Sequence, residues 1–393
     1  MTIGLVLNNL PKISETFLVS KIKGLQNDGA DVILFAKREQ NVKYFNLCRV
    51  EYQRGIVKSK LLQAGMILFF LSKLFIRRPS VVFRYFSLEK KDDIKLMRRI
   101  KNLYINSHIL NEDLDWIHFS YATLMIRREN IAGALKAKMG VSFRGYDISI
   151  YPLKHKFCYQ IASSKIHKIH SISKDLLNIS YDVGFNRDIP AVIINPSIDT
   201  NHFKIKKSTP SKDRKINFLT VARLHWKKGI EYTLESLSIL KKQGFRFKYT
   251  IIGSGEELER LIYATYQLNL EHDVIFVGDV IHSGIKKYYE NAKIYLQYSI
   301  QEGFCNSVLE AQAMGLLTIV SNAEGLSENI IDKHTGFVVE KRSPELLARK
   351  IKFVLSIPTK KADKIRTNAA LRVQHEFTMN DQGRKFSEFF GYK

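Results

Sequence analysis

Short apolar runs alternate with amphipathic stretches along most of the chain. Residues 2–9 form a β-rich apolar run, residues 16–29 follow a helical pattern, and residues 31–37 form a second apolar run. A strand, a helix and a strand in succession make a βαβ unit, which implies a parallel sheet. The alternation returns over residues 115–197 and again over residues 216–355. The pattern therefore predicts an α/β protein with two Rossmann-like, doubly wound domains that face each other across a cleft.

A polar, basic stretch at residues 204–215 separates the two alternating series. We therefore expect a first domain over residues 1–203 and a second over residues 204–376. The closing stretch, residues 377–393, is expected to form a helix that returns to the first domain. Residues 55–112 interrupt the alternation of the first domain and predict a basic, mostly helical insertion.

One helical stretch of this insertion, residues 61–76, is apolar on almost every side. It contains Gln63, Ser72 and Lys73 and is shorter than the ~20 apolar residues that span a membrane, so we predict no membrane span. Basic residues flank it at both ends: Lys58, Lys60, Arg77 and Arg78. Two interpretations stay open, a helix that lies on anionic lipid and a buried helix of the first domain.

The net charge of the chain indicates which classes of partner it can attract. The 393 residues include 62 Lys or Arg and 38 Asp or Glu, a formal net charge of +24, and the first 100 residues contribute 19 − 8 = +11. Such a field attracts nucleic acids, anionic membrane surfaces and phosphorylated substrates, although a solvated basic surface also explains it. We find no nucleic-acid recognition motif and predict no nucleic-acid partner.

The sequence gives no sign of a metal site or of a disulfide framework. Cys48, Cys158 and Cys305 are far apart and lack metal-ligand spacing, which fits a reducing cytosol. The N-terminal stretch lacks the basic region of a signal peptide, so we expect a cytoplasmic protein. Asp113 and Asp115 form a D-x-D pattern, but they precede a first-domain strand on the side away from the cleft, and we predict no metal there.

Two glutamates eight positions apart are the first candidates for chemistry. Glu302 lies in the loop after a predicted strand, and Glu310 lies one turn into the helix that starts near Asn306 or Ser307. The first N–H groups of a helix carry partial positive charge, so a diphosphate can bind there. The alternative is structural, because Ser307 and Glu310 also have the spacing of a capping box.

Cations and glycines on neighbouring loops add to this site. Arg223 ends the first strand of the second domain and Lys228 follows five residues later, so both can neutralise a diphosphate leaving group. Gly253 and Gly255 form a strand-to-helix turn, which admits one nucleotide but is weak support for a dinucleotide site.

Taken in order, several segments resemble the retaining glycosyltransferases of family four, which have the GT-B fold. They are VIINPSIDTNHF, VARLHWKKG, IIGSGEELERL, VIFVGDV, QEGFCNSVLEAQAMG and ENIIDKHTGFVVE, and the match covers residues 185–355. The amino-terminal half is more loosely similar, through LPKISETFLVSKIKGLQNDGADVILFA and SFRGYDI, to the colanic-acid-type branch that builds bacterial surface and capsular polysaccharides.

The resemblance implies roles for individual residues. Glu302 would contact the donor sugar, Arg223 and Lys228 the diphosphate, and Glu310 the nucleotide ribose; the first three are the catalytic candidates. The other donor-binding candidates are Gly253, Gly255, Val277, Gly278, Gly303, Phe304, Cys305, Asn306 and Ser307. The acceptor or first-domain cleft candidates are Glu15, His118, Arg144 and Asp147.

The chain also departs from the family pattern. Arg144 stands where many relatives have a histidine before glycine, and Ser120 stands where a second histidine is usual, after His118. The glycine-rich first loop is replaced by NNLPKISETF. Arg144 is expected to pair with a phosphate or with Asp147, or to form a structural salt bridge. These changes concern the acceptor and the donor sugar, and they leave the nucleotide-binding half unaffected.

The resemblance implies a retaining hexosyltransferase that uses a nucleotide sugar, such as a UDP- or GDP-sugar, without a cofactor or metal. The expected acceptor is a hydroxyl of a saccharide, lipid-linked in bacterial surface polysaccharide synthesis. An anionic membrane surface is an expected partner, at the inner face of the plasma membrane. The alternative is a nucleotide-sugar epimerase or a phosphorylase-like GT-B enzyme.

Overall fold

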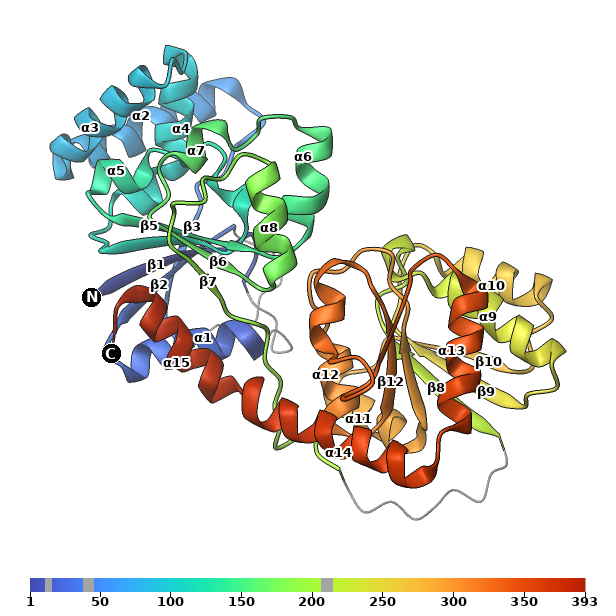
Figure 1. The fold of residues 1–393 in the computed structure, drawn as a ribbon. Helices are drawn as coiled ribbons and strands as arrows, with labels where there is room; N and C mark the ends of the chain where they lie inside the picture. Colours follow the sequence, from blue (N-terminus) through green and yellow to red (C-terminus); the bar gives the residue numbers. More distant parts are fainter. Residues whose placement is uncertain (11–15, 38–45, 206–214, 393) are drawn as a thin grey trace. The chain divides into compact units, whose positions relative to one another are not determined.

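The computed structural model describes residues 1–10, 16–37, 46–205 and 215–392 of the chain. The chain forms two compact units, one of Met1–Ile194 with Gln382–Lys393 and the other of Asn195–Asp381 (Figure 1). Each unit is a parallel sheet covered by helices, which confirms the predicted class of two doubly wound α/β domains.

The first unit has a seven-stranded sheet in the order β3-β2-β1-β4-β5-β6-β7, and each pair of neighbouring strands is parallel. Its strands are β1 (Thr2–Val6), β2 (Asp31–Ala36), β3 (Arg49–Tyr52), β4 (Trp116–Phe119), β5 (Lys138–Phe143), β6 (Lys168–Ser171) and β7 (Ala191–Ile193). Its helices are α1 (Thr16–Asn27), α2 (Lys60–Arg77), α3 (Pro79–Lys91), α4 (Leu96–Leu110), α5 (Ile131–Leu135), α6 (Tyr151–Lys154), α7 (Gln160–Ser163) and α8 (Lys174–Asp182), with short helical turns at η1 (Ala122–Met125) and η2 (Tyr146–Ile150).

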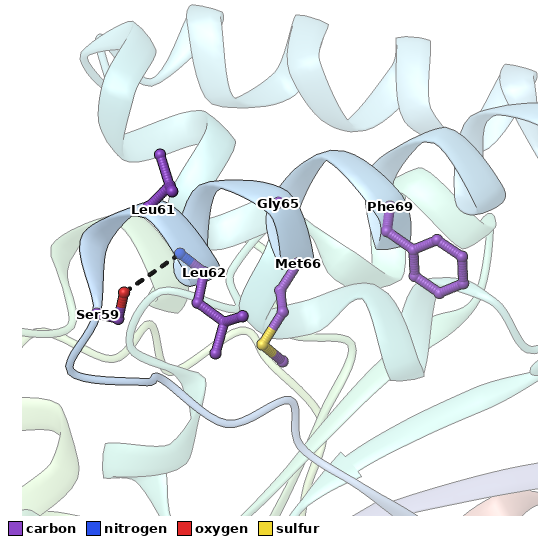
Figure 2. A pocket seen from close by; sticks show the side chains of 6 residues that line it. All are labelled: Ser59, Leu61, Leu62, Gly65, Met66 and Phe69. Atoms are coloured by element: carbon purple, nitrogen blue, oxygen red, sulfur yellow. Dashed lines mark hydrogen bonds between the residues drawn. The ribbon is translucent and has the colours of Figure 1, made fainter.

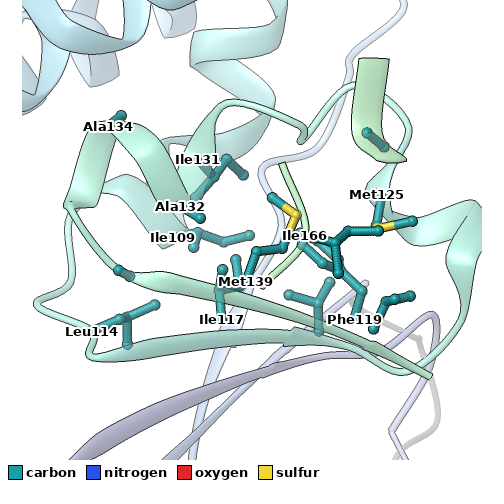
Figure 3. Close-up of a cluster of buried hydrophobic side chains, with 14 of the residues drawn as sticks. Ile109, Leu114, Ile117, Phe119, Met125, Ile131, Ala132, Ala134, Met139 and Ile166 are labelled. Atoms are coloured by element: carbon teal, nitrogen blue, oxygen red, sulfur yellow. The ribbon is translucent and has the colours of Figure 1, made fainter. Parts of the chain in front are cut away.

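The sheet of the first unit is buried on both faces, because alternate residues of a strand point to opposite sides. Ile33 and Phe35 of β2 join the core layer that contains α4 and α5, whereas Val32 and Leu34 join a second layer with α1. Figure 3 shows part of the first layer, where Ile109 of α4 lies among side chains of β4 and β5. Continuous apolar runs are what a strand buried on both faces requires.

The predicted helical insertion at residues 55–112 is present as α2, α3 and α4. The interpretation of residues 61–76 as a buried helix is wrong, because Leu74 is the one residue of α2 in the buried class. Within the described residues, no helix combines the length and the apolar content that crossing a membrane would take.

The second unit has a six-stranded sheet in the order β10-β9-β8-β11-β12-β13. Its strands are β8 (Ile216–Val221), β9 (Phe247–Ile252), β10 (Val274–Gly278), β11 (Ile294–Gln297), β12 (Leu317–Ser321) and β13 (Phe337–Val339). Its helices are α9 (Ile230–Lys242), α10 (Leu258–Gln267), α11 (His282–Asn291), α12 (Asn306–Ala313), α13 (Pro344–Ser356) and α14 (Thr359–Glu376), with η3 (Trp226–Lys228) and η4 (Glu324–Asn329).

The units divide at residues 194 and 382, whereas the sequence placed the boundaries at 203 and 377. Residues 195–203 pack with the second unit, because Ile198 pairs with Thr378 and the ring of Phe203 lies 5.3 Å from that of His282. Helix α15 (Met379–Phe390) begins in the second unit and continues into the first. Most of the expected linker, residues 206–214, lies outside the described residues.

Candidate active site

Four loops of the second unit meet at one edge of its sheet. The strands are parallel, so the segments that follow β8, β9, β10 and β11 lie at the same edge. Arg223, Gly253 and Glu302 lie in the segments after β8, β9 and β11, and Gly278 is the last residue of β10. The strand order reverses between β8 and β11, and ligands of doubly wound sheets bind at such a reversal.

Lys228 and Glu302 form an ion pair across this reversal, between the lysine Nζ and the glutamate Oε2. Their side chains are only 18% and 15% exposed. Burial, the largest single cause, lowers the pKa of Lys228, but attraction and hydrogen bonding to Glu302, together with attraction to Cys305, outweigh it, so the pKa is raised. The backbone supports the pair, because the Ile300 N–H donates to the Lys227 carbonyl at 2.6 Å.

The loop after β8 concentrates positive charge beside Glu302. Arg223 is exposed, and Lys227 lies between it and Lys228 in sequence. Burial lowers the pKa of Lys227, attraction to Glu302 opposes this, and repulsion from Arg223 lowers the pKa further. Lys227 was not among the predicted site residues, although it stands beside Lys228 in the motif VARLHWKKG. The loop therefore offers three cations to an anionic ligand.

Glycines allow these loops to pack closely. A Cβ at Gly229 would lie 2.2 Å from the Tyr298 carbonyl oxygen, and one at Gly255 would lie 2.1 Å from that of Leu224. At Gly253, where φ is +128°, a Cβ would lie 2.1 Å from the Ala222 carbonyl oxygen. Only glycine therefore fits at positions 253 and 255, because both pack against the loop that carries Arg223. Contact of either glycine with a nucleotide stays a prediction.

Glu310 is buried and both of its carboxylate oxygens have partners. Nε2 of His282 lies 3.0 Å from Oε1, and the Tyr289 hydroxyl donates to Oε2 at 2.8 Å. The hydrogen bond to Glu310 is the largest cause that raises the pKa of His282. Sequence reasoning missed both partners, whose only signal is a seven-residue spacing that places them on one face of α11.

The capping-box interpretation of Ser307 and Glu310 is wrong. Helix α12 begins at Asn306 with Cys305 at the N-cap position, and no side chain caps it. Ser307 lies inside the helix, where its hydroxyl accepts from the Tyr295 hydroxyl at 2.7 Å. Glu310 therefore has no part in closing its own helix, and the positive end of α12 has no capping carboxylate.

The segment before α12 is fixed by the buried side chain of Asn329. Its Oδ1 accepts from the Cys305 N–H at 3.1 Å and its Nδ2 donates to the Cys305 carbonyl at 3.1 Å. Phe304 and Cys305 are buried, so they can offer a ligand mainly their backbone. Gly303 precedes them, in the loop after Glu302.

Val277 and Gly278 end strand β10 beside the β9 turn. Val277 sits where the pairing with β9 shifts register, and the Gly278 carbonyl accepts from the Gly253 N–H at 2.9 Å. The expected contact of this segment with a base stays a prediction.

Two of the first-unit candidates, His118 and Asp147, are buried inside that unit. His118 of β4 is 0% exposed, its Nε2 lies 2.7 Å from the Ser142 hydroxyl, and its ring packs against Phe389 and Phe390. Burial is the main cause that lowers the pKa of His118. His118 therefore presents no exposed atom in this structure, and its expected place among the acceptor or first-domain cleft residues stays a prediction.

Asp147 is also 0% exposed, and it accepts hydrogen bonds from three backbone N–H groups. Its Oδ2 accepts from the Ala122 N–H at 2.9 Å, and its Oδ1 accepts from the Arg144 and Gly145 N–H groups at 3.1 and 3.0 Å. The half-buried Arg144 side chain donates from Nε to the Ser120 carbonyl at 3.1 Å. Glu15 lies outside the described residues.

Asp113 and Asp115, the D-x-D pair, have structural partners. Asp115 accepts from the Thr2 N–H at 2.7 Å, and Asp113 pairs with Arg78.

Comparison with known proteins shows which family the second half of the chain resembles. Residues 201–372 match the family model described as glycosyl transferases group 1. Residues 201–372 form a group 1 glycosyltransferase domain. The predicted enzyme class, glycosyltransferase, and the predicted likeness to group 1 glycosyltransferases are thereby confirmed. The alternatives of an epimerase or a phosphorylase-like enzyme are not favoured.

Relatives of this glycosyltransferase extend over more of the chain. It is 29% identical over 289 residues to the amylovoran biosynthesis glycosyltransferase AmsK of Erwinia amylovora, covering 70% of this chain and 69% of that protein. It is 22% identical over 397 residues to the putative colanic acid biosynthesis glycosyltransferase WcaL of Escherichia coli, covering 96% of each. Its fold matches that of Anabaena HepE in complex with UDP, with a TM-score of 0.73 at 14% identity over 98% of each chain.

Proposed function

We propose that this glycosyltransferase moves a hexosyl group from a nucleotide sugar, such as a UDP- or GDP-sugar, to a hydroxyl of a lipid-linked saccharide, with retention at the anomeric carbon. The setting is bacterial surface polysaccharide synthesis in the cytoplasm, at the inner face of the plasma membrane. Support comes from relatives named for amylovoran and colanic acid biosynthesis, and from a structural neighbour that binds UDP.

The Lys228–Glu302 pair, at the reversal of the sheet and beside Arg223, carries this proposal. Glu302 accepts hydrogen bonds from hydroxyls of the donor sugar. Lys228 holds that carboxylate in place and, with Arg223, faces the diphosphate. Charge develops on the leaving phosphate as its bond to the sugar breaks, so preorganised cations there stabilise the transition state more than the ground state.

Glu310 serves the other end of the donor. His282 and Tyr289 occupy one hydrogen-bonding direction on each of its oxygens. A carboxylate offers about four lone-pair sites, so two remain for the hydroxyls of a ribose. The two partners thus orient Glu310 and leave it capacity to bind.

The transfer itself is a front-face substitution. The bond between the anomeric carbon and the phosphate oxygen breaks as the acceptor oxygen bonds to the same face of that carbon. The acceptor proton passes to the leaving phosphate oxygen, so no separate nucleophile is needed. Arg223, Lys228 and the start of α12 supply the positive charge at the phosphate, and we propose that the reaction needs no metal.

The test is to follow the release of nucleoside diphosphate with and without a saccharide acceptor, and to determine the anomeric configuration of the product by NMR. We expect release only with acceptor, an unchanged anomeric configuration and no loss of rate in EDTA. Equal release without acceptor would contradict transfer. An inverted product would contradict retention, and a rate lost in EDTA would contradict metal independence.

A further inference from the structure

Helix α2 exposes an apolar stripe along its whole length. Leu61, Leu68 and Ile76 are 87%, 73% and 81% exposed, and Leu62 and Phe69 lie on the same side with about 60% exposure each. Their spacing follows the helical repeat. At the far end Phe75 makes ring contact, at 5.5 Å, with Phe83 of α3, which is also exposed.

A shallow apolar hollow opens in the first turns of this stripe. It is lined by Ser59, Leu61, Leu62, Gly65, Met66 and Phe69 (Figure 2). Gly65 leaves open space beside the helix, since a Cβ there would meet nothing within 4 Å. Ser59 caps the helix by accepting from the Leu62 N–H, so the hollow lies on a well-formed helix start.

The opposite side of α2 is used by the first unit. Leu74 is buried, the ring of Phe70 lies 6.2 Å from that of Tyr104 on α4, and the Arg54 guanidinium lies 4.4 Å from the Phe70 ring centre. Because its inner side packs on the protein, α2 can offer a partner only its outer side. A surface that meets this side would lie parallel to the helix axis.

The charge around the stripe has one sign. Residues 52–88 contain seven Lys or Arg and no Asp or Glu. Lys58 and Lys60 are exposed at the start of α2, and Lys73 and Arg77 are exposed at its end. A long apolar stripe between exposed cations matches a layer with negative head groups above an apolar interior.

We propose that the outer side of α2 seats this protein on an anionic lipid bilayer, with the helix lying in the plane of the interface. The stripe from Leu61 to Ile76 enters the boundary between head groups and acyl chains, and the flanking lysines and Arg77 meet lipid phosphates. This rests on the proposed function in one respect, since a lipid-linked acceptor lies at the same surface.

The test measures binding of the full chain to vesicles by flotation, without donor or acceptor. We compare vesicles of equal phosphatidylglycerol and phosphatidylcholine with vesicles of phosphatidylcholine alone. The wild-type chain should bind the anionic vesicles, and Leu68→Glu with Ile76→Glu should lower that binding at least tenfold. The matched control, Ile262→Glu with Tyr266→Glu, changes two exposed residues of α10 by the same charge and should stay within twofold of wild type.

A second variant tests the electrostatic part. Lys60→Ala, Lys73→Ala and Arg77→Ala together should weaken binding by about fivefold for each charge removed, and less at high salt. Equal binding of the wild type to both vesicle types would overturn the proposal, as would full binding by the glutamate variant. A dimer that the glutamate variant abolishes, with no vesicle binding, would overturn it in favour of a second copy of the chain.

Vesicle binding and sugar transfer can fail separately. The flotation assay contains no substrate, so it does not depend on the proposed reaction. Transfer to a water-soluble saccharide by the glutamate variant should equal that of the wild type, because Leu68 and Ile76 belong to the first unit and the loops that carry Glu302 belong to the second.

Discussion

At the scale of single residues, the Lys228–Glu302 pair is the feature on which the proposed chemistry depends. The two side chains come from loops 74 residues apart, and the backbone bond from Ile300 to Lys227 keeps the loops together. Glu302 also has its own N–H bonded to Oε2 of Glu324 at 3.0 Å. The carboxylate therefore has a fixed position before any sugar reaches it.

Glu302→Gln should separate catalysis from nucleotide binding. The amide keeps the size of the side chain but loses the charge, and with it the ion pair to Lys228. We expect transfer to fall by about 10²–10³-fold, the usual cost of removing one group that acts on the transition state. Affinity for the nucleoside diphosphate, measured by calorimetry, should change far less.

The matched control for this variant is Glu376→Gln. Glu376 lies in the same unit, on α14, and pairs with Arg372 while its side chain is 55% exposed. Transfer by this variant should match the wild type. Wild-type turnover in Glu302→Gln would remove Glu302 from the mechanism.

The His282–Glu310 pair should make stability depend on pH. The pKa of folded His282 is raised above its ordinary 6.5 by the hydrogen bond to Glu310, so the pair stabilises the fold most below pH 6.5. This contribution is lost as the pH rises through the raised pKa. Because the His282 side chain is 37% exposed, the effect is at most about 1 kcal/mol.

The measurement is the urea midpoint of wild type and of His282→Asn at several values from pH 6 to pH 9. The gap between the two proteins should be widest at pH 6 and shrink as the pH rises. Asp199 also raises the pKa of His282, but less than Glu310 does. When both proteins also carry Asp199→Asn, the difference between their urea midpoints should therefore shrink only in part. A gap that does not change with pH would contradict a charged His282 bonded to Glu310.

Sequence reasoning found the charged residues of the site but not the residues that hydrogen-bond to Glu310. Glu302, Lys228 and Arg223 could be predicted, because each follows a strand of a parallel sheet and such ends share an edge. His282 and Tyr289 could not, since their contact with Glu310 depends on how α11 packs beside α12. For the same reason the burial of His118 and Asp147 was not visible in the local pattern.

At the scale of elements, periodicity predicted where strands and helices lie but not how their ends are finished. The helix expected over residues 229–243 is α9, Ile230–Lys242. The start of α12 was located correctly near Asn306, yet the capping box that the sequence suggested is not made. Ser307 has another partner, Tyr295, which comes from the neighbouring strand β11. A cap is a competition between local and tertiary hydrogen bonds, and only the folded chain decides it.

Helix α2 is a second case in which the sequence pattern predicted the element but not its environment. An apolar pattern all round the helix was compatible with burial and with an interfacial position. The pattern could not decide, because it records hydrophobicity and not what covers each side. Packing of Phe70 and Leu74 on the first unit uses one side, and the exposed stripe is the side that remains.

At the scale of the whole molecule, the chain returns at its end to the unit with which it began. Residues from Gln382 onward belong to the first unit, and α15 lies beside α1 there (Figure 1). A Cβ at Gly24 would lie 2.8 Å from the Cα of Gly383, so the two helices touch through their glycines. Lys21 is buried in this contact, and its ammonium lies 4.4 Å from the ring centre of Phe386. The C-terminal segment thus completes the core of the first unit.

Phe389→Ala should therefore destabilise a unit that lies more than 190 residues away in sequence. Phe389 is 1% exposed, packs against Trp116 and His118, and has the Lys168 ammonium 4.9 Å from its ring centre. Removing a buried phenylalanine ring costs about 3–5 kcal/mol, because the lost burial and the cavity add. Phe353→Ala is the control, since that ring is 47% exposed on α13, and it should cost much less. Calorimetric unfolding would measure both, because the expected shift in midpoint for Phe389→Ala is several degrees. An unchanged midpoint in Phe389→Ala would mean that α15 does not close the first core in solution, and the buried environments of His118 and Lys21 would then need another explanation.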